Sequence, residues 1–198
     1  LATALGTDRE TTWSALRRGS SGLRSLDSGD VGAPLPFSAP DDEDPVLHLV
    51  DALVDEACAD ARLDLRTVDR DRVATLIGLS KGGVHALSRL GRGSGRLPEA
   101  ETAHWWRRVP PSTAASRTAD RHDLRGPISA PIAACATGLV AVLQGAALIR
   151  SGACDIALAG SADASLEPWI LGAFRSMKAL APLDRDPARA VRPWDRDR

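Results

Sequence analysis

The sequence has little net charge and no long uninterrupted apolar run. Its 25 Lys and Arg nearly balance its 26 Asp and Glu, so the net charge of the 198 residues is −1. That balance gives no electrostatic reason to expect a nucleic acid or a membrane surface as partner. The longest apolar stretch, residues 127–149, is interrupted by Thr137, Gln144 and glycines, which favours a buried helix over a membrane span. Because no basic segment follows Leu1, we also expect no signal peptide and a cytoplasmic protein.

Cysteine is scarce as well, and its spacing does not suggest a metal site. There are three cysteines, Cys58, Cys135 and Cys154, an odd number without the close pairs that bind zinc. The four histidines lie near none of them in sequence: His48, His85, His104 and His122. We therefore expect no metal and a reducing compartment.

Two glycine-rich stretches fail the motifs that they suggest. In "GLSKGGV", residues 78–84, Gly83 is followed by Val84 and not by the Lys-Ser/Thr pair of a phosphate-binding loop. In "GRGSGR", residues 91–96, arginine stands where a dinucleotide-binding fingerprint has its third glycine. A strand-end turn and a mobile loop are the simpler interpretations.

The apolar pattern predicts an α/β fold. Thr7 and Glu10 form a capping-box pattern before a first helix with Trp13 and Leu16 on one face, and Asp44 with Pro45 begins a second helix. Further along we expect strands at 72–80, 128–134 and 154–160 and helices at 113–123 and 136–150, with an irregular segment at 104–112. The strands show little alternation of apolar and polar residues, which is typical of a sheet covered on both faces.

Cys135 is the candidate nucleophile. It stands where a predicted strand meets a predicted helix, and the unpaired N–H groups and dipole of a helix N-terminus favour thiolate over thiol. Its small neighbours, which include Ala134 and Ala136, would let a substrate carbonyl approach the sulfur. The same N–H groups could hold the oxyanion that forms when a thioester is attacked. A buried packing cysteine is the alternative, and "ACATG" alone leaves both open.

A chain of linked motifs over residues 124–198 resembles the β-ketoacyl synthases, the condensing enzymes of fatty acid and polyketide synthesis. In order, the stretches are "LRGP" (124–127), "ACATG" (134–138), "LIRSGACDIALAGSAD" (148–163), Pro168, "GAF" (172–174), "KAL" (178–180) and "RPWDRDR" (192–198). The ending resembles the elongating branch that depends on an acyl carrier protein. "TALGTDRETTWSALRRGSSGL" and "RVATLIGLSKGG" resemble earlier parts of the family more loosely.

The resemblance implies the N-terminal half of a thiolase-like layered α/β/α fold, with 1–198 forming one domain truncated at both ends. Cys135 aligns with the nucleophile that accepts an acyl group from the phosphopantetheine of an acyl carrier protein, before condensation with a malonyl-type extender. Ala134 and Ala136 would border the substrate, and Phe174 falls where the family has an aromatic residue beside the active site. The strand at 155–160 resembles the one through which members dimerise. No cofactor bound by the chain is implied.

The resemblance also implies missing parts. The family takes two histidines, usually a lysine and the second oxyanion N–H group from its C-terminal half, and we expect this chain to be inactive without that half. The segment "TAHWWRRVPPSTAAS" departs from the family's tunnel-lining segment, which leaves acyl length open. Two alternatives are a non-catalytic partner subunit of the chain-length-factor type and a thiolase-fold acyltransferase acting on coenzyme A thioesters.

Overall fold

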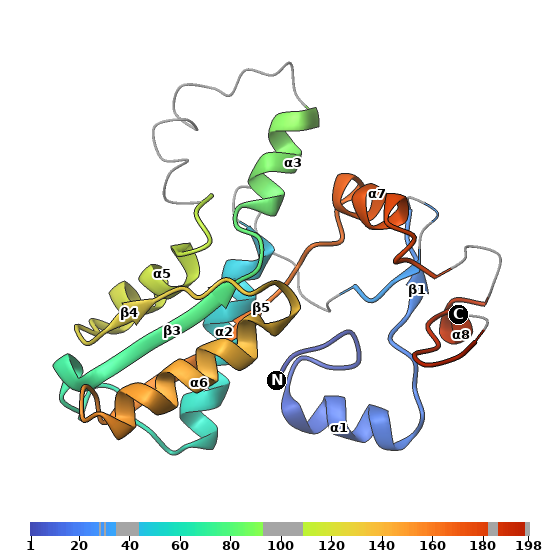
Figure 1. The fold of residues 1–198 in the computed structure, drawn as a ribbon. Coiled ribbons are helices and arrows are strands. Elements are labelled where there is room, and N and C mark those ends of the chain that lie inside the picture. The colour runs from blue at the N-terminus through green and yellow to red at the C-terminus, as the bar shows by residue number, and fades with distance from the viewer. Residues whose placement is uncertain (28, 30, 35–43, 93–108, 182–185, 197–198) are drawn as a thin grey trace. The chain divides into compact units, whose positions relative to one another are not determined.

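The structure is a computed structural model. It describes residues 1–27, 29, 31–34, 44–92, 109–181 and 186–196 (Figure 1). By contacts the chain divides into two compact units, one of Leu1–Ser38 with Ala164–Arg198 and one of Ala39–Asp163. The single domain expected over 1–198 stays a prediction. The loop expected at 91–96 begins in a helix at residues 91 and 92 and otherwise lies outside the described residues, as does most of the irregular segment at 104–112.

A three-stranded parallel sheet forms the centre of the unit Ala39–Asp163. Its order is β4 (Ile128–Ser129), β3 (Val73–Leu79) and β5 (Ile156–Ala162). β3 is buried along its whole length and pairs with β5 from Val73↔Ile156 to Leu79↔Ala162. The buried strand predicted at 72–80 is thus confirmed. The strand predicted at 154–160 is present as β5, but its residues are half-buried or exposed and not fully buried as expected. The strand predicted at 128–134 is wrong beyond Ser129, because Pro131 has no N–H to give to a ladder and the chain turns toward the next helix.

Helices cover both faces of this sheet (Figure 1). α6 (Thr137–Arg150) packs on β3 and β5 from one side, whereas α2 (Pro45–Asp60) and α5 (Thr113–His122) pack from the other. Alternate residues of β3 serve the two layers: Leu76 packs with Ala141 of α6, and Val73 packs with Ala119 of α5. The expected layered α/β/α arrangement is therefore present. The helices predicted at 113–123 and 136–150 are confirmed, and α3 (Val84–Arg92) follows β3.

The helix caps show one success and one error of the prediction. α2 begins as predicted, with Pro45 at its first position and Asp44 Oδ1 accepting the N–H of Val46 at 3.2 Å. α1 (Arg9–Arg17) is capped by Asp8 and not by Thr7, because the box forms between Asp8 and Thr11. Asp8 Oδ1 accepts the Thr11 N–H at 2.7 Å, and the carboxylate also suits the positive end of the helix.

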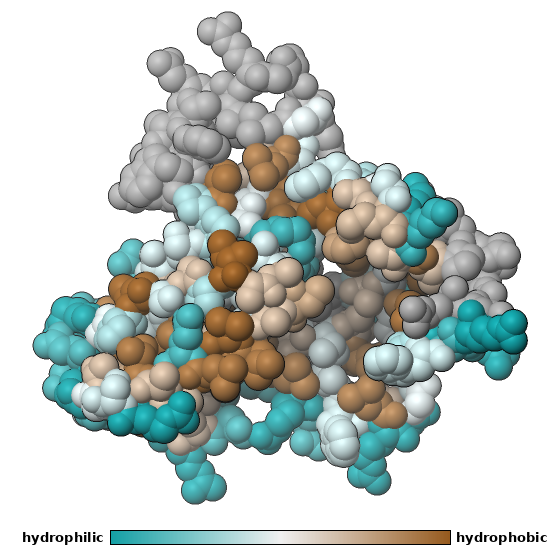
Figure 2. Space-filling model, viewed as in Figure 1, coloured by the Kyte–Doolittle hydropathy of each residue, from teal (hydrophilic) through white to brown (hydrophobic). Residues whose placement is uncertain are grey.

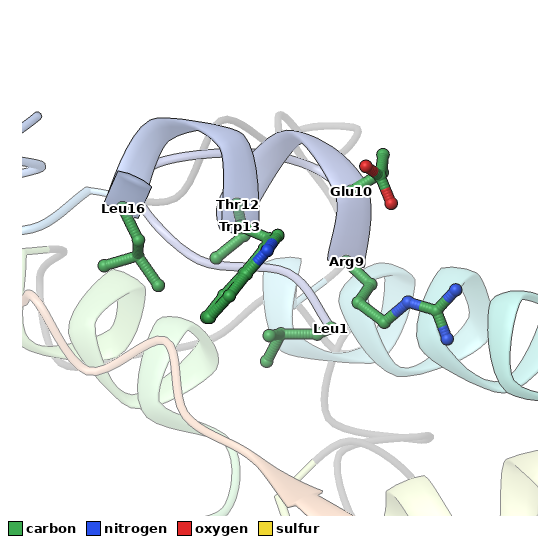
Figure 3. A pocket seen from close by; sticks show the side chains of 6 residues that line it. All are labelled: Leu1, Arg9, Glu10, Thr12, Trp13 and Leu16. Atoms are coloured by element: carbon green, nitrogen blue, oxygen red, sulfur yellow. The ribbon is translucent and has the colours of Figure 1, made fainter. Parts of the chain in front are cut away.

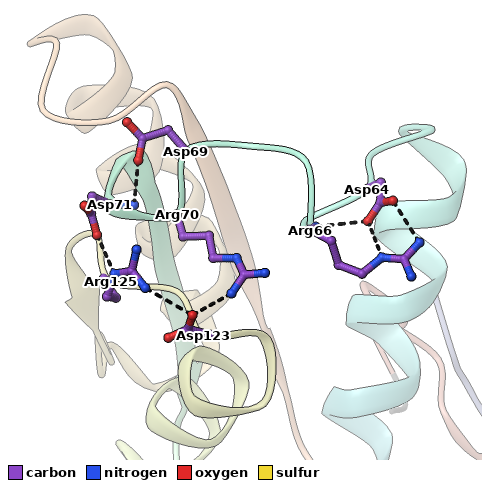
Figure 4. Close-up of polar contacts among 7 residues, drawn as sticks. All are labelled: Asp64, Arg66, Asp69, Arg70, Asp71, Asp123 and Arg125. Atoms are coloured by element: carbon purple, nitrogen blue, oxygen red, sulfur yellow. Dashed lines mark hydrogen bonds and ion pairs between the residues drawn. The ribbon is translucent and has the colours of Figure 1, made fainter.

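Salt bridges tie together the amino ends of the strands in this unit. Arg72, in the short 3-10 helix η1 (Arg70–Arg72), donates two hydrogen bonds of 2.5 Å to Asp155, just before β5. Beside it, Arg70 and Arg125 both contact Asp123 Oδ2, at 2.5 and 3.0 Å (Figure 4). The hydrogen bond from Arg70 is the main reason that the pKa of Asp123 is lowered. These salt bridges lie at the amino ends of the strands, and the candidate site lies at the opposite, carboxyl ends.

The other unit consists of short elements. β1 (Arg24–Ser25) and β2 (Val31–Gly32) pair antiparallel, and α7 (Pro168–Ser176) and α8 (Pro187–Ala190) complete it with α1. A groove of about 310 Å³ lies on α1, where Leu1, Trp13 and Leu16 share one side of the helix (Figure 3). The shared face predicted for Trp13 and Leu16 is confirmed. None of the helices in the described ranges combines the length and the apolar composition that a bilayer crossing needs.

Candidate active site

Cys135 lies on a single tight turn in front of α6. The turn is the 3-10 helix η3 (Ala134–Ala136), and α6 follows it directly at Thr137. Cys135 is exposed, and so are Ala134 and Ala136 on either side of it. Its thiol therefore does not fill the core, which contradicts the packing alternative, and it stands beside the N–H groups at the start of a 14-residue helix.

The backbone of this turn is held by Thr137. Ala134 has a φ of 49°, in the left-handed region that alanine rarely adopts. Thr137 Oγ1 accepts the N–H of Ala133 at 3.0 Å and donates to the carbonyl of Ala134 at 2.7 Å. The side chain of Thr137 thus bridges the two residues that precede Cys135, and the residue is only 3% exposed.

Glycines bring the turn close to the sheet. A Cβ on Gly78 of β3 would lie 2.3 Å from Thr137 Cγ2 and 2.5 Å from the Pro131 carbonyl oxygen. A Cβ on Gly138, in the first turn of α6, would lie 2.6 Å from Ser161 Oγ of β5. The start of α6 and its cysteine are therefore placed directly over the carboxyl ends of β3 and β5.

A second polar cluster lies at the same ends of these strands. Lys81 Nζ contacts Asp163 Oδ2 at 2.8 Å and Ser80 Oγ at 2.9 Å, and Ser80 Oγ donates to Asp163 Oδ2 at 3.0 Å. Ser80 and Lys81 follow β3, and Asp163 follows β5. The sequence reasoning missed this cluster. Its signal was available, because residues that directly follow two neighbouring parallel strands come together at one edge.

The other residues singled out from the sequence have different surroundings. Cys154 is 1% exposed and packs with Leu76 and Ala141 in the core. Cys58 is partly buried, and this burial, with the nearby Asp55, raises the pKa of its thiol. Phe174 belongs to α7 in the other unit and is 37% exposed. In the ranges that the structure describes, no three His, Cys, Asp or Glu side chains come together as metal ligands would.

The comparison with known families identifies the family of this chain. The β-ketoacyl synthase N-terminal domain matches residues 34–197, a range that includes Cys135 and the strands around it. The chain belongs to the β-ketoacyl synthase family. It is 31% identical over 150 residues to the tetracenomycin polyketide synthase ketoacyl synthase alpha subunit of Streptomyces glaucescens, covering 72% of this chain and 35% of that protein.

Two further matches cover nearly the whole chain. The 3-oxoacyl-(acyl-carrier-protein) synthase 2 of Coxiella burnetii is 27% identical, over 98% of this chain and 51% of that protein. The crystal structure of a β-ketoacyl synthase from Burkholderia phymatum STM815 superposes with a TM-score of 0.81 at 24% identity, over 98% of this chain and 52% of that one. The family and the thiolase-like fold that the linked motifs predicted are confirmed. The chain spans about half the length of these two proteins, and it matches the N-terminal domain of the family.

Proposed function

We propose that this chain is the N-terminal part of a 3-oxoacyl-acyl-carrier-protein synthase and that Cys135 is its acyl-accepting nucleophile. The observation that supports this most is the exposed Cys135 on a strained turn at a helix N-terminus, inside the range that matches the family. Neither of the other two cysteines combines exposure with a helix start.

The proposed reaction has two steps at this sulfur. In the first, the Cys135 thiolate attacks the carbonyl of an acyl thioester, the new S–C bond forms, and the phosphopantetheine thiol leaves with a proton. In the second, a malonyl-type extender loses CO₂, and its carbanion attacks the acyl group. The Cys135 S–C bond then breaks and a 3-oxoacyl thioester is released. The N–H groups at the start of α6 can stabilise the oxyanion of each attack, and the small Ala134 and Ala136 leave room for the substrate.

The proposed partners follow from the same reaction. An acyl carrier protein would deliver the acyl group on its phosphopantetheine, so the chain needs no cofactor of its own. The synthase's C-terminal half would supply the two histidines and the second oxyanion N–H group. An apolar surface on α6 supports a covering partner of this kind, since four of its large residues are exposed (Figure 2): Leu139, Val142, Leu143 and Ile149.

Pairing between ketosynthase subunits is proposed through β5. This seven-residue strand contains no charged residue and pairs with β3 on one side, while no described strand pairs with its other edge. Such an edge is a template for another strand. In a homodimer or a heterodimer, a strand of the second subunit would pair with this edge. We propose the cytoplasm as the compartment of the protein.

The remaining proposals concern Phe174 and the two alternative functions. Phe174 remains our proposal for the aromatic residue beside the acyl group. A chain-length-factor-type subunit needs no nucleophile, and the exposed Cys135 therefore argues against it. The "RPWDRDR" ending, where Arg192 pairs with Asp195 at 3.2 Å, resembles the carrier-protein branch and argues against coenzyme A thioesters.

Selective alkylation tests the nucleophile. Iodoacetamide at neutral pH, applied to the intact protein, is expected to label Cys135 at least about tenfold faster than Cys58 or Cys154, since those thiols are partly or fully buried. Peptide mass spectrometry gives the three rates. Cys135→Ala serves as the control for site assignment. Equal rates at the three cysteines in folded protein would remove the case for an activated thiol.

A further inference from the structure

Thr137 has two chemically different contacts beneath the candidate nucleophile. Its hydroxyl bonds to the N–H of Ala133 and to the carbonyl of Ala134, at 3.0 and 2.7 Å. Its methyl group lies over the bare backbone of Gly78, where a Cβ would come within 2.3 Å of it. The hydroxyl therefore acts on the turn that carries Cys135, and the methyl group acts on the packing of that turn against β3.

The hydroxyl compensates for an unfavourable backbone conformation. Ala134 has a φ of 49°, which brings its Cβ close to backbone atoms and destabilises the turn. One hydrogen bond of Thr137 holds the peptide group between Ala134 and Cys135, and the other holds the peptide group between Ile132 and Ala133. Together they fix the chain before and after Ala134, which favours the conformation that this φ requires. Without them, Ala134 would relax toward negative φ, and the direction of the next residue, Cys135, would change.

We propose that Thr137 is a positioning residue for the nucleophile: its hydroxyl keeps Ala134 in the left-handed conformation and thereby directs the Cys135 side chain toward the substrate. The inference rests on the proposed role of Cys135. It goes beyond that role, because it assigns the orientation of the sulfur to a residue that itself does not touch the reacting atoms. A purely structural Thr137 would affect stability through its methyl and hydroxyl alike and would leave the reactivity of the exposed thiol unchanged.

Two substitutions separate the hydroxyl from the methyl group. Thr137→Val keeps the shape and removes both hydrogen bonds, whereas Thr137→Ser keeps the hydroxyl and removes the contact with Gly78. The readout is the rate of iodoacetamide alkylation at Cys135 in the intact protein. In that reaction the sulfur forms an S–C bond, iodide leaves, and the thiol proton passes to the buffer. Thermal unfolding of each variant reports its folding separately.

The expected pattern is specific to the hydroxyl. Thr137→Val is expected to slow alkylation of Cys135 by about tenfold, because it removes both hydrogen bonds that hold the turn carrying the sulfur. Thr137→Ser stays within about twofold of the original rate although it loses the methyl contact. An unchanged rate in Thr137→Val, or equal slowing in both variants, overturns the proposal.

A glycine at position 134 provides an independent check. Glycine adopts positive φ without steric cost, so Ala134→Gly in the Thr137→Val background is expected to recover the rate to within about threefold of Thr137→Ser. This comparison holds even if Thr137→Val alone does not fold. No recovery in folded double variant overturns the proposal. Failure of the parent protein to label Cys135 selectively would instead overturn the proposed nucleophile itself.

Discussion

The three cysteine thiols differ in how far they are exposed to solvent. Cys154 is enclosed in the core, and burial raises the pKa of Cys58, which lowers its thiolate fraction at neutral pH. Cys135 is exposed on a turn whose backbone is fixed by a buried hydroxyl. A thiol that attacks a thioester must be accessible and correctly oriented. Cys135 is accessible, and we propose that its neighbours in the turn provide the orientation.

At the residue scale, we predict that Gly78→Ala lowers the free energy of unfolding by about 1–3 kcal/mol. The new Cβ would meet the Pro131 carbonyl oxygen at 2.5 Å and the methyl group of Thr137, so the turn must shift. Urea unfolding measures the loss, and alkylation of Cys135 should slow with it. Gly160→Ala, in β5, is the matched control because its added Cβ would meet no atom within 4 Å beyond its own chain neighbours. Equal losses of unfolding free energy in both variants would contradict the close packing of the turn against Gly78.

The sequence was enough to propose Cys135 as the nucleophile, but not to point to the residues that we propose orient it. Cysteine between a strand and a helix, followed by the linked motifs, was enough to propose a nucleophile. The role of Thr137 depends on a positive φ at Ala134, and alanine gives no sign of that conformation in sequence. Gly78 falls in the predicted strand at 72–80 and is the last-but-one residue of β3, but the room that it makes for Thr137 is visible only in the structure.

The strands beneath the site, β3 and β5, are held together by a salt bridge at their opposite, amino ends. Arg72 and Asp155, 83 residues apart, join the starts of β3 and β5, and the full register of seven pairs follows from there. α6 then crosses both strands with Gly145 facing Ala157 and Ala159 of β5. Because the helix approaches so closely, the position of its first turn is determined by the strands beneath it.

At the element scale, Asp155→Asn should destabilise the protein at neutral pH and less so in acid. The hydrogen bonds and charge of Arg72 lower the pKa of Asp155. Their stabilisation is present above the unfolded-state pKa of about 4 and is lost as pH falls through the lower folded-state pKa. The gap in urea midpoint between parent and variant should therefore shrink below about pH 4. Asp120→Asn, at an exposed position of α5, is the control. A gap that does not depend on pH would contradict the salt bridge.

Secondary structure was predictable where the pattern was local and strong. Runs of apolar residues predicted the strands β3 and β5 and the long helices, and Asp44 with Pro45 predicted the start of α2. The errors came from competition between near-equivalent residues: Asp8 replaced Thr7 as the cap of α1, and Pro131 ended β4 after two residues. The cluster of Ser80, Lys81 and Asp163 could be predicted only with the knowledge that β3 and β5 pair in parallel, and that pairing is not visible in the sequence.

At the scale of the whole molecule, the proposed nucleophile is accompanied by an exposed apolar surface on α6. α6 presents Leu139, Val142, Leu143 and Ile149 outward, although its other side is packed on the sheet. A helix that is apolar all round is normally buried on all sides. The C-terminal half of a synthase would cover it and bring histidines to the site, so condensation is proposed for that assembly and acyl transfer to Cys135 for this chain's part of it.

The most direct test of the account is the loading of an acyl group onto Cys135. The intact protein is incubated with an acyl thioester of an acyl carrier protein and then analysed by peptide mass spectrometry. We predict one acyl group, attached to Cys135 and released by hydroxylamine, and none in folded Cys135→Ala. Absence of the adduct in folded protein, or an adduct that persists in Cys135→Ala, would contradict the central claim that Cys135 is the acyl-accepting nucleophile.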